Sequence, residues 1–144
     1  MNLIAKRFSE LSAEEVYEII KSRTEVFLLE QNIICQDLDD VDYESLHCFF
    51  RDGKRVVAYL RVYKEEEADC VSIGRVLTLV HGRGMGRELM EKSEEELKRY
   101  YKRSKVTLHA QKSAIGFYEK LGFSIVSDEF LEEGVVHVTM EKQV

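Results

Sequence analysis

The sequence predicts an α/β fold, in which a mixed β-sheet is flanked by helices. Short runs rich in β-branched and aromatic residues alternate with two longer stretches whose apolar residues recur at helical spacing. A glycine-rich segment joins one strand-like run to the second of these stretches. The expected order is a strand, a helix, four strands interrupted by one helix, a short helix and two closing strands. With 144 residues and no proline or Gly/Ser-rich linker, residues 1–144 are expected to form a single domain.

The chain opens with a predicted strand and a predicted helix. Residues 2–8 are typical of a strand. Ser12 followed by Glu15 has the pattern of a capping box, in which each side chain satisfies a backbone N–H group at the start of a helix. The side of this helix expected to face the core comprises Val16, Ile19, Ile20, Arg23, Val26 and Phe27. Arg23 is therefore expected on the buried side.

An acidic connector over residues 31–44 precedes the central strands. Three stretches have the composition of strands, and they span residues 47–51, 55–63 and 70–79. Asp52-Gly53 lies between the first two and predicts a hairpin turn, because such turns need positive φ angles.

The second half of the chain begins with the glycine-rich segment 82–86. A helix is expected to follow it, with Leu89, Met90, Ser93, Leu97, Tyr100 and Tyr101 on one face. Residues 106–109 are then expected as a strand and residues 113–121 as a short helix ended by Gly122. The closing strand pair is expected over residues 123–126 and 135–140.

Composition narrows the class of protein. Hydrophobic residues make up 44% of the chain and charged residues 33%, which is typical of a folded globular protein. No apolar run approaches the roughly 20 residues of a membrane helix, and residues 1–8 lack the apolar core of a signal peptide, so a cytoplasmic protein without a membrane partner is expected. The net charge of -6 argues against nucleic acid and favours a cationic substrate.

Neither a disulfide framework nor a metal site is expected. Cys35, Cys48 and Cys70 are odd in number and lack a CxxC pair, so they are expected as half-buried thiols. An acidic run resembles a calcium loop, but Val41 occupies its fifth position and no glycine follows at the sixth. We interpret this run, Asp37, Asp39, Asp40, Asp42 and Glu44, as a solvated or amine-attracting rim.

The segment from His81 to Arg87, His-Gly-Arg-Gly-Met-Gly-Arg, is the strongest local signal. Glycines let a backbone approach a ligand closely, and the free N–H groups at a helix start bind phosphate. The segment is neither a Walker A loop, because no Lys-Ser/Thr pair follows, nor a dinucleotide fingerprint, because its glycine spacing differs. A pyrophosphate site for another cofactor and a simple tight turn with a helix cap both fit it.

Together with the segment Ala110 to Phe123, this loop resembles the GNAT acetyltransferases. The loop is similar to their (Q/R)xxGx(G/A) pyrophosphate loop, although His81 stands at its first position, and the second segment is similar to their "A...YeklGF" helix. The resemblance covers nearly the whole chain and points to the ElaA-like branch. Residues that carry it include Arg23, Glu30-Gln31, Asp39, Asp42, His47, Tyr59-Leu60-Arg61, Ile73-Gly74-Arg75-Val76, Gly134, His137 and Met140.

The resemblance implies a fold, a cosubstrate and a set of contacts. The fold is a mixed, mostly antiparallel sheet of six to seven strands, splayed at its centre and flanked by helices. The cosubstrate is acetyl-CoA, whose pantetheine arm follows the strand that ends near Leu79 and whose pyrophosphate rests on the loop amides. Residues implied in cofactor binding are Val76, Leu77, Thr78, Gly82, Arg83, Gly84, Met85, Gly86, Arg87 and Phe117. Arg83 and Arg87 could instead be solvated.

The implied reaction is transfer of an acetyl group to an amine by direct attack within a ternary complex. A backbone N–H near Leu77 or Thr78 could stabilise the oxyanion, and Tyr118 is the expected general acid, unless it only packs in the core. Glu30 and His137 are the favoured general bases among Glu30, Asp39, Asp42, His47, His109 and His137. Glu30 could instead cap the first helix or pair with Arg75, and His137 could be a core histidine. Asp42, His47 and Arg75 are expected to contact the substrate.

Two other functions fit the same residues. The chain could hold acyl-CoA as a non-catalytic sensor, or it could be a structural or interaction protein on the same scaffold. The expected partners of the enzyme are acetyl-CoA and an amine, which is a small molecule or a protein amine, and the expected state is a monomer or homodimer.

Overall fold

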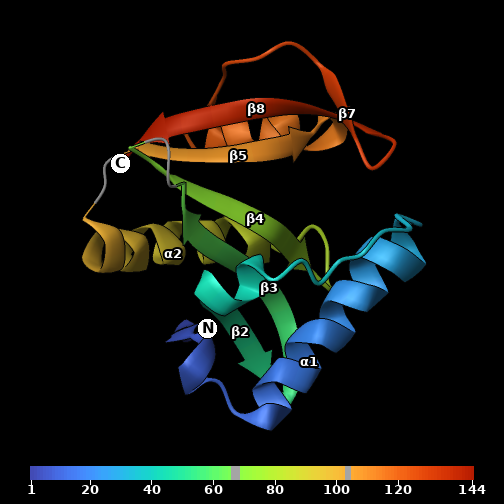
Figure 1. Cartoon of the computed structure of the whole chain (residues 1–144), viewed down its shortest axis with the longest axis vertical. Coiled ribbons are helices and arrows are strands. Elements are labelled where there is room, and N and C mark those ends of the chain that lie inside the picture. The colour runs from blue at the N-terminus through green and yellow to red at the C-terminus, as the bar shows by residue number, and fades with distance from the viewer. Residues whose placement is uncertain (66–68, 103–104) are drawn as a thin grey trace.

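The computed structural model describes residues 1–65, 69–102 and 105–144. Its centre is one sheet in the order β1-β2-β3-β4-β5-β8-β6, with β7 paired to β8 (Figure 1). The strands are β1 (Ile4–Arg7), β2 (Leu46–Asp52), β3 (Arg55–Lys64), β4 (Val71–Thr78), β5 (Lys105–Gln111), β6 (Ser124–Ile125), β7 (Phe130–Glu132) and β8 (Val135–Gln143). Among the described residues only β4 and β5 pair in parallel, so the mixed, mostly antiparallel sheet is confirmed, with one strand, β7, more than the sequence predicts.

Three α-helices and four shorter helical segments connect these strands. The α-helices are α1 (Ala13–Arg23), α2 (Met85–Tyr101) and α3 (Ile115–Lys120). The shorter segments are η1 (Phe8–Glu10), η2 (Thr24–Glu30), η3 (Val41–Glu44) and η4 (Lys112–Ala114). The η2 segment continues α1 directly but has π-helical hydrogen bonding, a rare geometry that frequently occurs at functional sites.

The predicted start of α1 is confirmed. Ser12 accepts a hydrogen bond from the Glu15 N–H group at 3.1 Å, and the Glu15 carboxylate accepts one from the Ser12 N–H group at 2.9 Å. The buried position expected of Arg23 is also confirmed, since the residue is 1% exposed. The helix is therefore fixed at its start by its cap and at its end by a buried cation.

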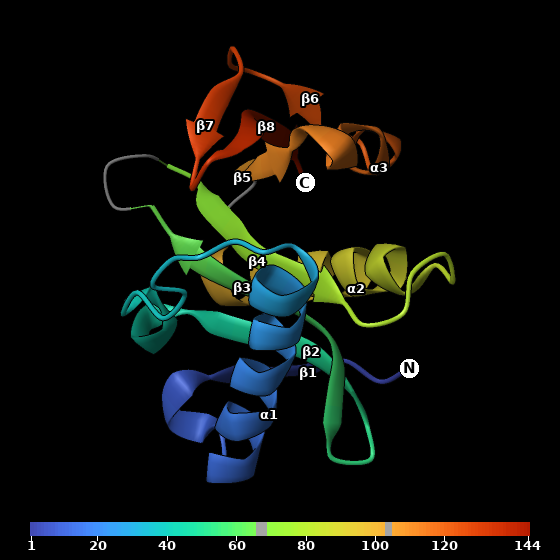
Figure 2. The ribbon, with the colours of Figure 1, turned by 90° about the vertical axis from the view of Figure 1, so that its right-hand side faces the viewer.

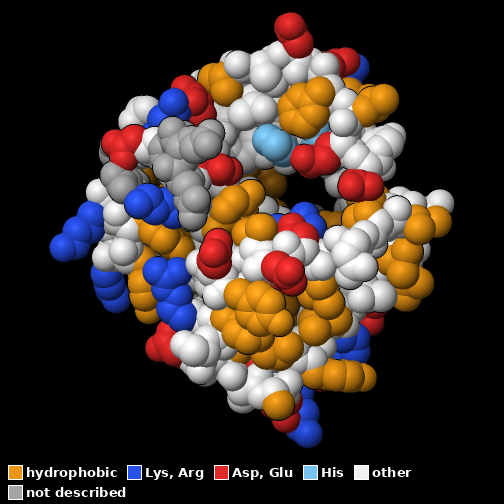
Figure 3. All heavy atoms as spheres, viewed as in Figure 1, with side chains coloured by type: hydrophobic (Ala, Val, Ile, Leu, Met, Phe, Trp, Pro, Cys, Tyr) orange, Lys and Arg blue, Asp and Glu red, His pale blue; other side chains and the backbone are white. Residues whose placement is uncertain are grey.

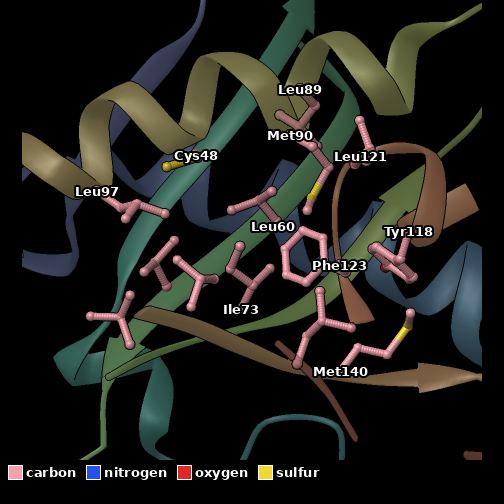
Figure 4. Packing of buried hydrophobic residues seen from close by; sticks show 14 of the residues in the cluster. Cys48, Leu60, Ile73, Leu89, Met90, Leu97, Tyr118, Leu121, Phe123 and Met140 are labelled. Atoms are coloured by element: carbon pink, nitrogen blue, oxygen red, sulfur yellow. The ribbon is translucent and has the colours of Figure 1, made fainter. Parts of the chain in front are cut away.

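The two long helices cover opposite faces of β2, β3 and β4 (Figure 2). Because side chains alternate along a strand, Cys48 and Phe50 of β2 face α2, whereas Phe49 packs in the cluster under α1. Leu89, Met90 and Leu97 of α2 are at most 1% exposed and pack toward Leu60 and Ile73 (Figure 4). Tyr118 and Phe123 extend the same cluster toward Met140 of β8.

The cysteines are free, but only two are buried. Cys48 lies in the core, where burial raises the pKa of its thiol to about 12, and Cys70 is also buried. Cys35 is exposed, so the expectation of three half-buried thiols is wrong. Among the described residues, no helix has both the length and the apolar character needed to cross a membrane.

Candidate active site

The sheet opens between β4 and β5. The two strands pair only where Val71–Ile73 meets Val106–Leu108; beyond this point β4 pairs with β3 alone and β5 with β8 alone. A register shift between Tyr59 and Arg61 and the left-handed backbone of Arg75, with φ 55°, bend β4 away at the same level. The diverging strands leave a cavity of about 490 Å³. A hollow is visible in this part of the surface, with acidic side chains and a histidine at its rim (Figure 3).

Tyr118 reaches this cavity from α3. The residue is 7% exposed, and its ring packs edge-on against Phe117 and Phe123, with centroid distances of 5.0 and 5.9 Å. Tyr118 lines the cavity, and its hydroxyl forms no hydrogen bond with any described residue. Burial raises the pKa of the phenol, so it stays protonated and can donate a proton.

His137 of β8 lies on the same wall. Its Nδ1 atom is 2.8 Å from the carbonyl oxygen of Val135, and its Nε2 atom is 3.5 Å from the carboxylate of Glu132. The second oxygen of Glu132 is 2.8 Å from Nδ1 of His109 on β5. Phe130 stacks on the His137 ring at 6.1 Å and meets His109 edge-on at 5.1 Å. The β7–β8 hairpin thus assembles two histidines and a carboxylate at the cavity.

The opposite wall is an arginine–aspartate network. Arg23 bonds Asp42 at 2.6 Å and Asp37 at 2.8 Å, while Arg61 bonds Asp39 at 2.7 Å and Asp42 at 3.1 Å. Arg75 reaches Asp37 at 2.8 Å. The hydrogen bond from Arg61 lowers the pKa of Asp39 to about 2. Burial opposes ionisation of Asp42, but the hydrogen bonds and positive charges of Arg23 and Arg61 together outweigh it and lower the pKa of that carboxyl.

This network bears on the expected acidic rim and on the expected substrate contacts of Asp42 and His47. Asp37, Asp39 and Asp42 are tied to three arginines, because the positive charges of α1, β3 and β4 all converge on the connector, whereas Asp40 and Glu44 are exposed to solvent. Asp42 lies behind the wall, and His47 is 2% exposed, with its ring nitrogens 2.7 Å from the Tyr59 hydroxyl and 2.8 Å from the Asp42 carbonyl. Neither lines the cavity, whereas Arg75 does.

Glu30 also lies outside the cavity lining. It ends η2, and its carboxylate is 2.8 Å from Nε2 of His81, at the start of the glycine loop. Both side chains are about half exposed or more, at 49% and 65%. Glu30 therefore pairs neither with Arg75 nor with a cavity residue.

The glycine loop leads into the start of α2. Gly84 is the N-cap residue, with φ 74°, and no side chain caps the helix, so the first N–H groups stay free for a ligand. A methyl group at Gly86 would lie 3.3 Å from the Phe117 ring and 3.6 Å from Thr78. Thr78, Gly86 and Phe117, which are far apart in the chain, thus meet at one point. Arg83 and Arg87 are exposed, and Arg87 pairs with Glu91 at 2.7 Å.

Sequence reasoning missed several cavity residues. Glu132 lies on β7, a strand that the sequence did not predict. The available signal was Glu133-Gly134, a turn pair whose φ angles are 50° and 76° and which sits directly before β8. Phe27, Gln31 and Tyr63 also line the cavity. The π-helical geometry of η2, which has no simple sequence signature, precedes Gln31.

Comparison with known proteins places this geometry in a family. The model of the acetyltransferase (GNAT) domain matches residues 5–144. Protein ElaA of Escherichia coli is 33% identical over 141 residues, which cover 94% of this chain and 92% of ElaA. The crystal structure of ElaA has a TM-score of 0.90 at 31% identity and 99% coverage of both chains. An acyl-CoA N-acyltransferase from Pseudomonas aeruginosa has the same TM-score at 30% identity and the same coverage. The chain therefore belongs to the GNAT acetyltransferase family, in the branch that contains ElaA.

Proposed function

We propose that the protein transfers an acetyl group from acetyl-CoA to an amine by direct attack within a ternary complex. The observation that carries the proposal is the cavity where β4 and β5 diverge, because it joins Tyr118, His137 and the open edge of β4. A neighbour from Thermoplasma acidophilum, with a TM-score of 0.73 and 14% identity, was solved in complex with coenzyme A. The glycine loop at the start of α2 supports a pyrophosphate site in this chain as well.

The open edge of β4 supports a place for the pantetheine arm and for the oxyanion. The Leu79 N–H group donates to the Val57 carbonyl of β3 at 2.9 Å. Because N–H groups alternate between the two edges of a strand, the Thr78 and Val76 N–H groups face away from β3, and Val76 lines the cavity. Of Leu77 and Thr78, Thr78 is thus the better oxyanion donor. One such donor contributes roughly 3 kcal/mol to stabilising the transition state.

An alkylamine has a pKa of about 10.4 and arrives as an ammonium ion. In the proposed mechanism His137 removes one proton, and the freed nitrogen lone pair attacks the thioester carbon. When the tetrahedral intermediate collapses, the carbon–sulfur bond breaks. Tyr118 then gives its proton to the departing thiolate and regains one from the former amine nitrogen. The products are the amide, coenzyme A and the proton held by His137, which passes to solvent.

The cavity favours His137 over Glu30 as the general base. His137 is 7% exposed and lines the cavity, whereas Glu30 pairs with His81 outside it. Glu30 is better placed to hold η2 against the glycine loop. His47 and Asp42 are proposed to support the wall and not to touch the substrate, since each is buried among fixed partners.

Thermal denaturation with and without acetyl-CoA tests the cofactor site. A ligand that binds only the folded protein stabilises it by about 2.7 kcal/mol at ~100 times its dissociation constant. Release of free thiol from acetyl-CoA, followed across a panel of primary amines, then tests turnover. A thermal shift without thiol release under any amine would favour a non-catalytic acyl-CoA sensor. No shift at millimolar acetyl-CoA would favour a structural or interaction protein.

A further inference from the structure

The tautomer of His137 is fixed by its backbone neighbour. Nδ1 lies 2.8 Å from the Val135 carbonyl oxygen, which can only accept a hydrogen bond. Nδ1 therefore carries the proton in the neutral ring, and the lone pair is on Nε2. The side chain is 8% exposed and borders the cavity. The neutral ring thus has a lone pair on Nε2, in a buried side chain that borders the space where substrate is expected.

The nearest polar atom to this nitrogen is another acceptor. Oε2 of Glu132 lies 3.5 Å from Nε2 of His137, beyond the usual range of a hydrogen bond. Oε1 of the same carboxylate is engaged by Nδ1 of His109 at 2.8 Å, where the imidazole must be the donor. Within the described part of the chain, no donor bonds Nε2. Nε2 of His137 and Oε2 of Glu132 thus lie close together, and neither atom accepts a hydrogen bond from a described residue.

The charges around this place are negative or neutralised. Glu132 and the adjacent Glu133 form no ion pair with a lysine or arginine of the described residues, and both line the cavity. Tyr118 and Gln111, the register partner of His137, are uncharged there. Arg61 and Arg75 on the opposite wall are held by Asp39 and Asp37. A cation entering the cavity therefore meets, on the His137 side, carboxylates that no lysine or arginine of the described residues neutralises.

We propose that His137 Nε2 and Glu132 Oε2 form the subsite that binds the ammonium group of the acceptor, and that the acceptor is a positively charged primary alkylamine. An R–NH₃⁺ group carries three N–H donors and can bridge both acceptors. The positive charge of the ammonium group is attracted to the Glu132 carboxylate, and Nε2 of His137 can accept a proton from it. His109 acts as a positioning residue, because it holds the carboxylate through Oε1.

This subsite rests on the proposed function, and it adds a prediction of which chemical class of amine should bind. An arylamine is uncharged at neutral pH, has fewer N–H donors and gains nothing from the charge of Glu132. A quaternary ammonium ion has the charge but no N–H donor. These two groups of compounds therefore separate hydrogen bonding to Nε2 from simple attraction to an acidic cavity.

Nitrogen NMR of ¹⁵N-histidine-labelled protein tests the subsite directly, with His137→Gln used to assign its signals. At pH 8 we expect a protonated Nδ1 and an unprotonated Nε2 for His137. Titration with ethylammonium chloride should shift the Nε2 signal saturably, whereas tetraethylammonium chloride at equal ionic strength should not. Glu132→Gln should weaken ethylammonium binding ~10-fold or more, since a hydrogen bond to a charged group contributes about 1.5–3 kcal/mol.

Glu129→Gln is the matched control, because Glu129 pairs with Lys112 at 3.0 Å on the surface just before β7 and loses the same charge. It should bind ethylammonium as the unaltered protein does. A proton on Nε2 in place of Nδ1, equal shifts with tetraethylammonium, or no shift with ethylammonium would each overturn the subsite. The acetyl-CoA thermal shift measured on the same sample reports separately on the proposed function, since its loss concerns the cofactor site and not this pair.

Discussion

At the scale of single residues, removal of the Tyr118 hydroxyl should reduce catalysis while leaving the stability of the fold nearly unchanged. The hydroxyl has no hydrogen-bond partner among the described residues, so Tyr118→Phe leaves no buried polar atom unsatisfied. We expect the free energy of unfolding to change by less than about 1 kcal/mol. We expect kcat to fall by about 10²- to 10⁴-fold, which is the usual contribution of a general acid. Urea denaturation and steady-state kinetics check both numbers. An active Tyr118→Phe enzyme would rule out the tyrosine as the acid.

Asp42 should matter for folding and not for substrate contact. It receives hydrogen bonds from Arg23 and Arg61, which are 1% and 3% exposed. Asp42→Ala removes a negative charge that pairs with two buried guanidinium groups. We therefore expect the free energy of unfolding, measured by urea denaturation, to fall by about 3 kcal/mol. Glu14→Ala removes an exposed partner of Arg51 and is expected to cost about 1 kcal/mol or less. Equal losses of unfolding free energy in the two variants would show that burial does not determine how much each ion pair contributes to stability.

The lowered pKa of Asp39 predicts the direction in which the stability of the protein changes with pH. The folded pKa of this carboxyl is about 2 and its ordinary value is 3.8, so the unfolded chain binds the proton more readily. A depressed pKa contributes stability that is fully present above the unfolded value and is lost as pH falls through the folded value. Stability should therefore fall between about pH 4 and pH 2, and less steeply in Asp39→Asn. Urea midpoints over this range are the measurement, and identical slopes would exclude Asp39 as a source.

At the scale of elements, pyrophosphate binding at the start of α2 can be tested with two variants that differ only in charge. Gly84 has φ 74°, and a side chain built there meets nothing within 4 Å. Asn and Asp have the same shape and both tolerate left-handed backbone. Gly84→Asp should weaken acetyl-CoA binding more than Gly84→Asn, because only the carboxylate repels a pyrophosphate. Calorimetric titration at two salt concentrations measures the difference, which should shrink in high salt.

The elements differ in how well sequence predicts them. Capping and periodicity determine α1 and α2 locally. The Ser12–Glu15 box and the buried face of Leu89, Met90, Ser93 and Leu97 are confirmed, whereas Tyr100, expected on the same face, is 40% exposed. The helix predicted at 113–121 is split in the structure into η4 and α3. The strand β7 was missed because it has only three residues, two of them exposed, so its pattern is too short to recognise. That short strand carries Glu132, which is why the carboxylate of the proposed ammonium subsite was missed with it.

At the scale of the whole molecule, the site combines local and long-range information. The glycine loop and the Tyr118 helix are continuous motifs and could be predicted. The charge pairing of the acidic connector could not, since Arg23, Arg61 and Arg75 come from three different elements and only the fold brings them to Asp37, Asp39 and Asp42. For the same reason sequence favoured Glu30, whose distance from the cavity depends on where η2 ends.

The division of the sheet into two halves predicts where acetyl-CoA should reduce hydrogen exchange. In the part of the chain that the structure describes, only Val71–Ile73 and Val106–Leu108 join the halves as paired strands, and the remaining edge of β4 beside the cavity has no strand partner. In the free protein, the Val76 and Thr78 amides should exchange faster than those of β2, which is paired on both sides. A pantetheine arm along β4 should slow exchange in residues 74–79 and at the start of α2, while residues 46–52 remain unchanged. Exchange mass spectrometry with and without acetyl-CoA measures this. Protection confined to β1 and β2 would place the cofactor on another face.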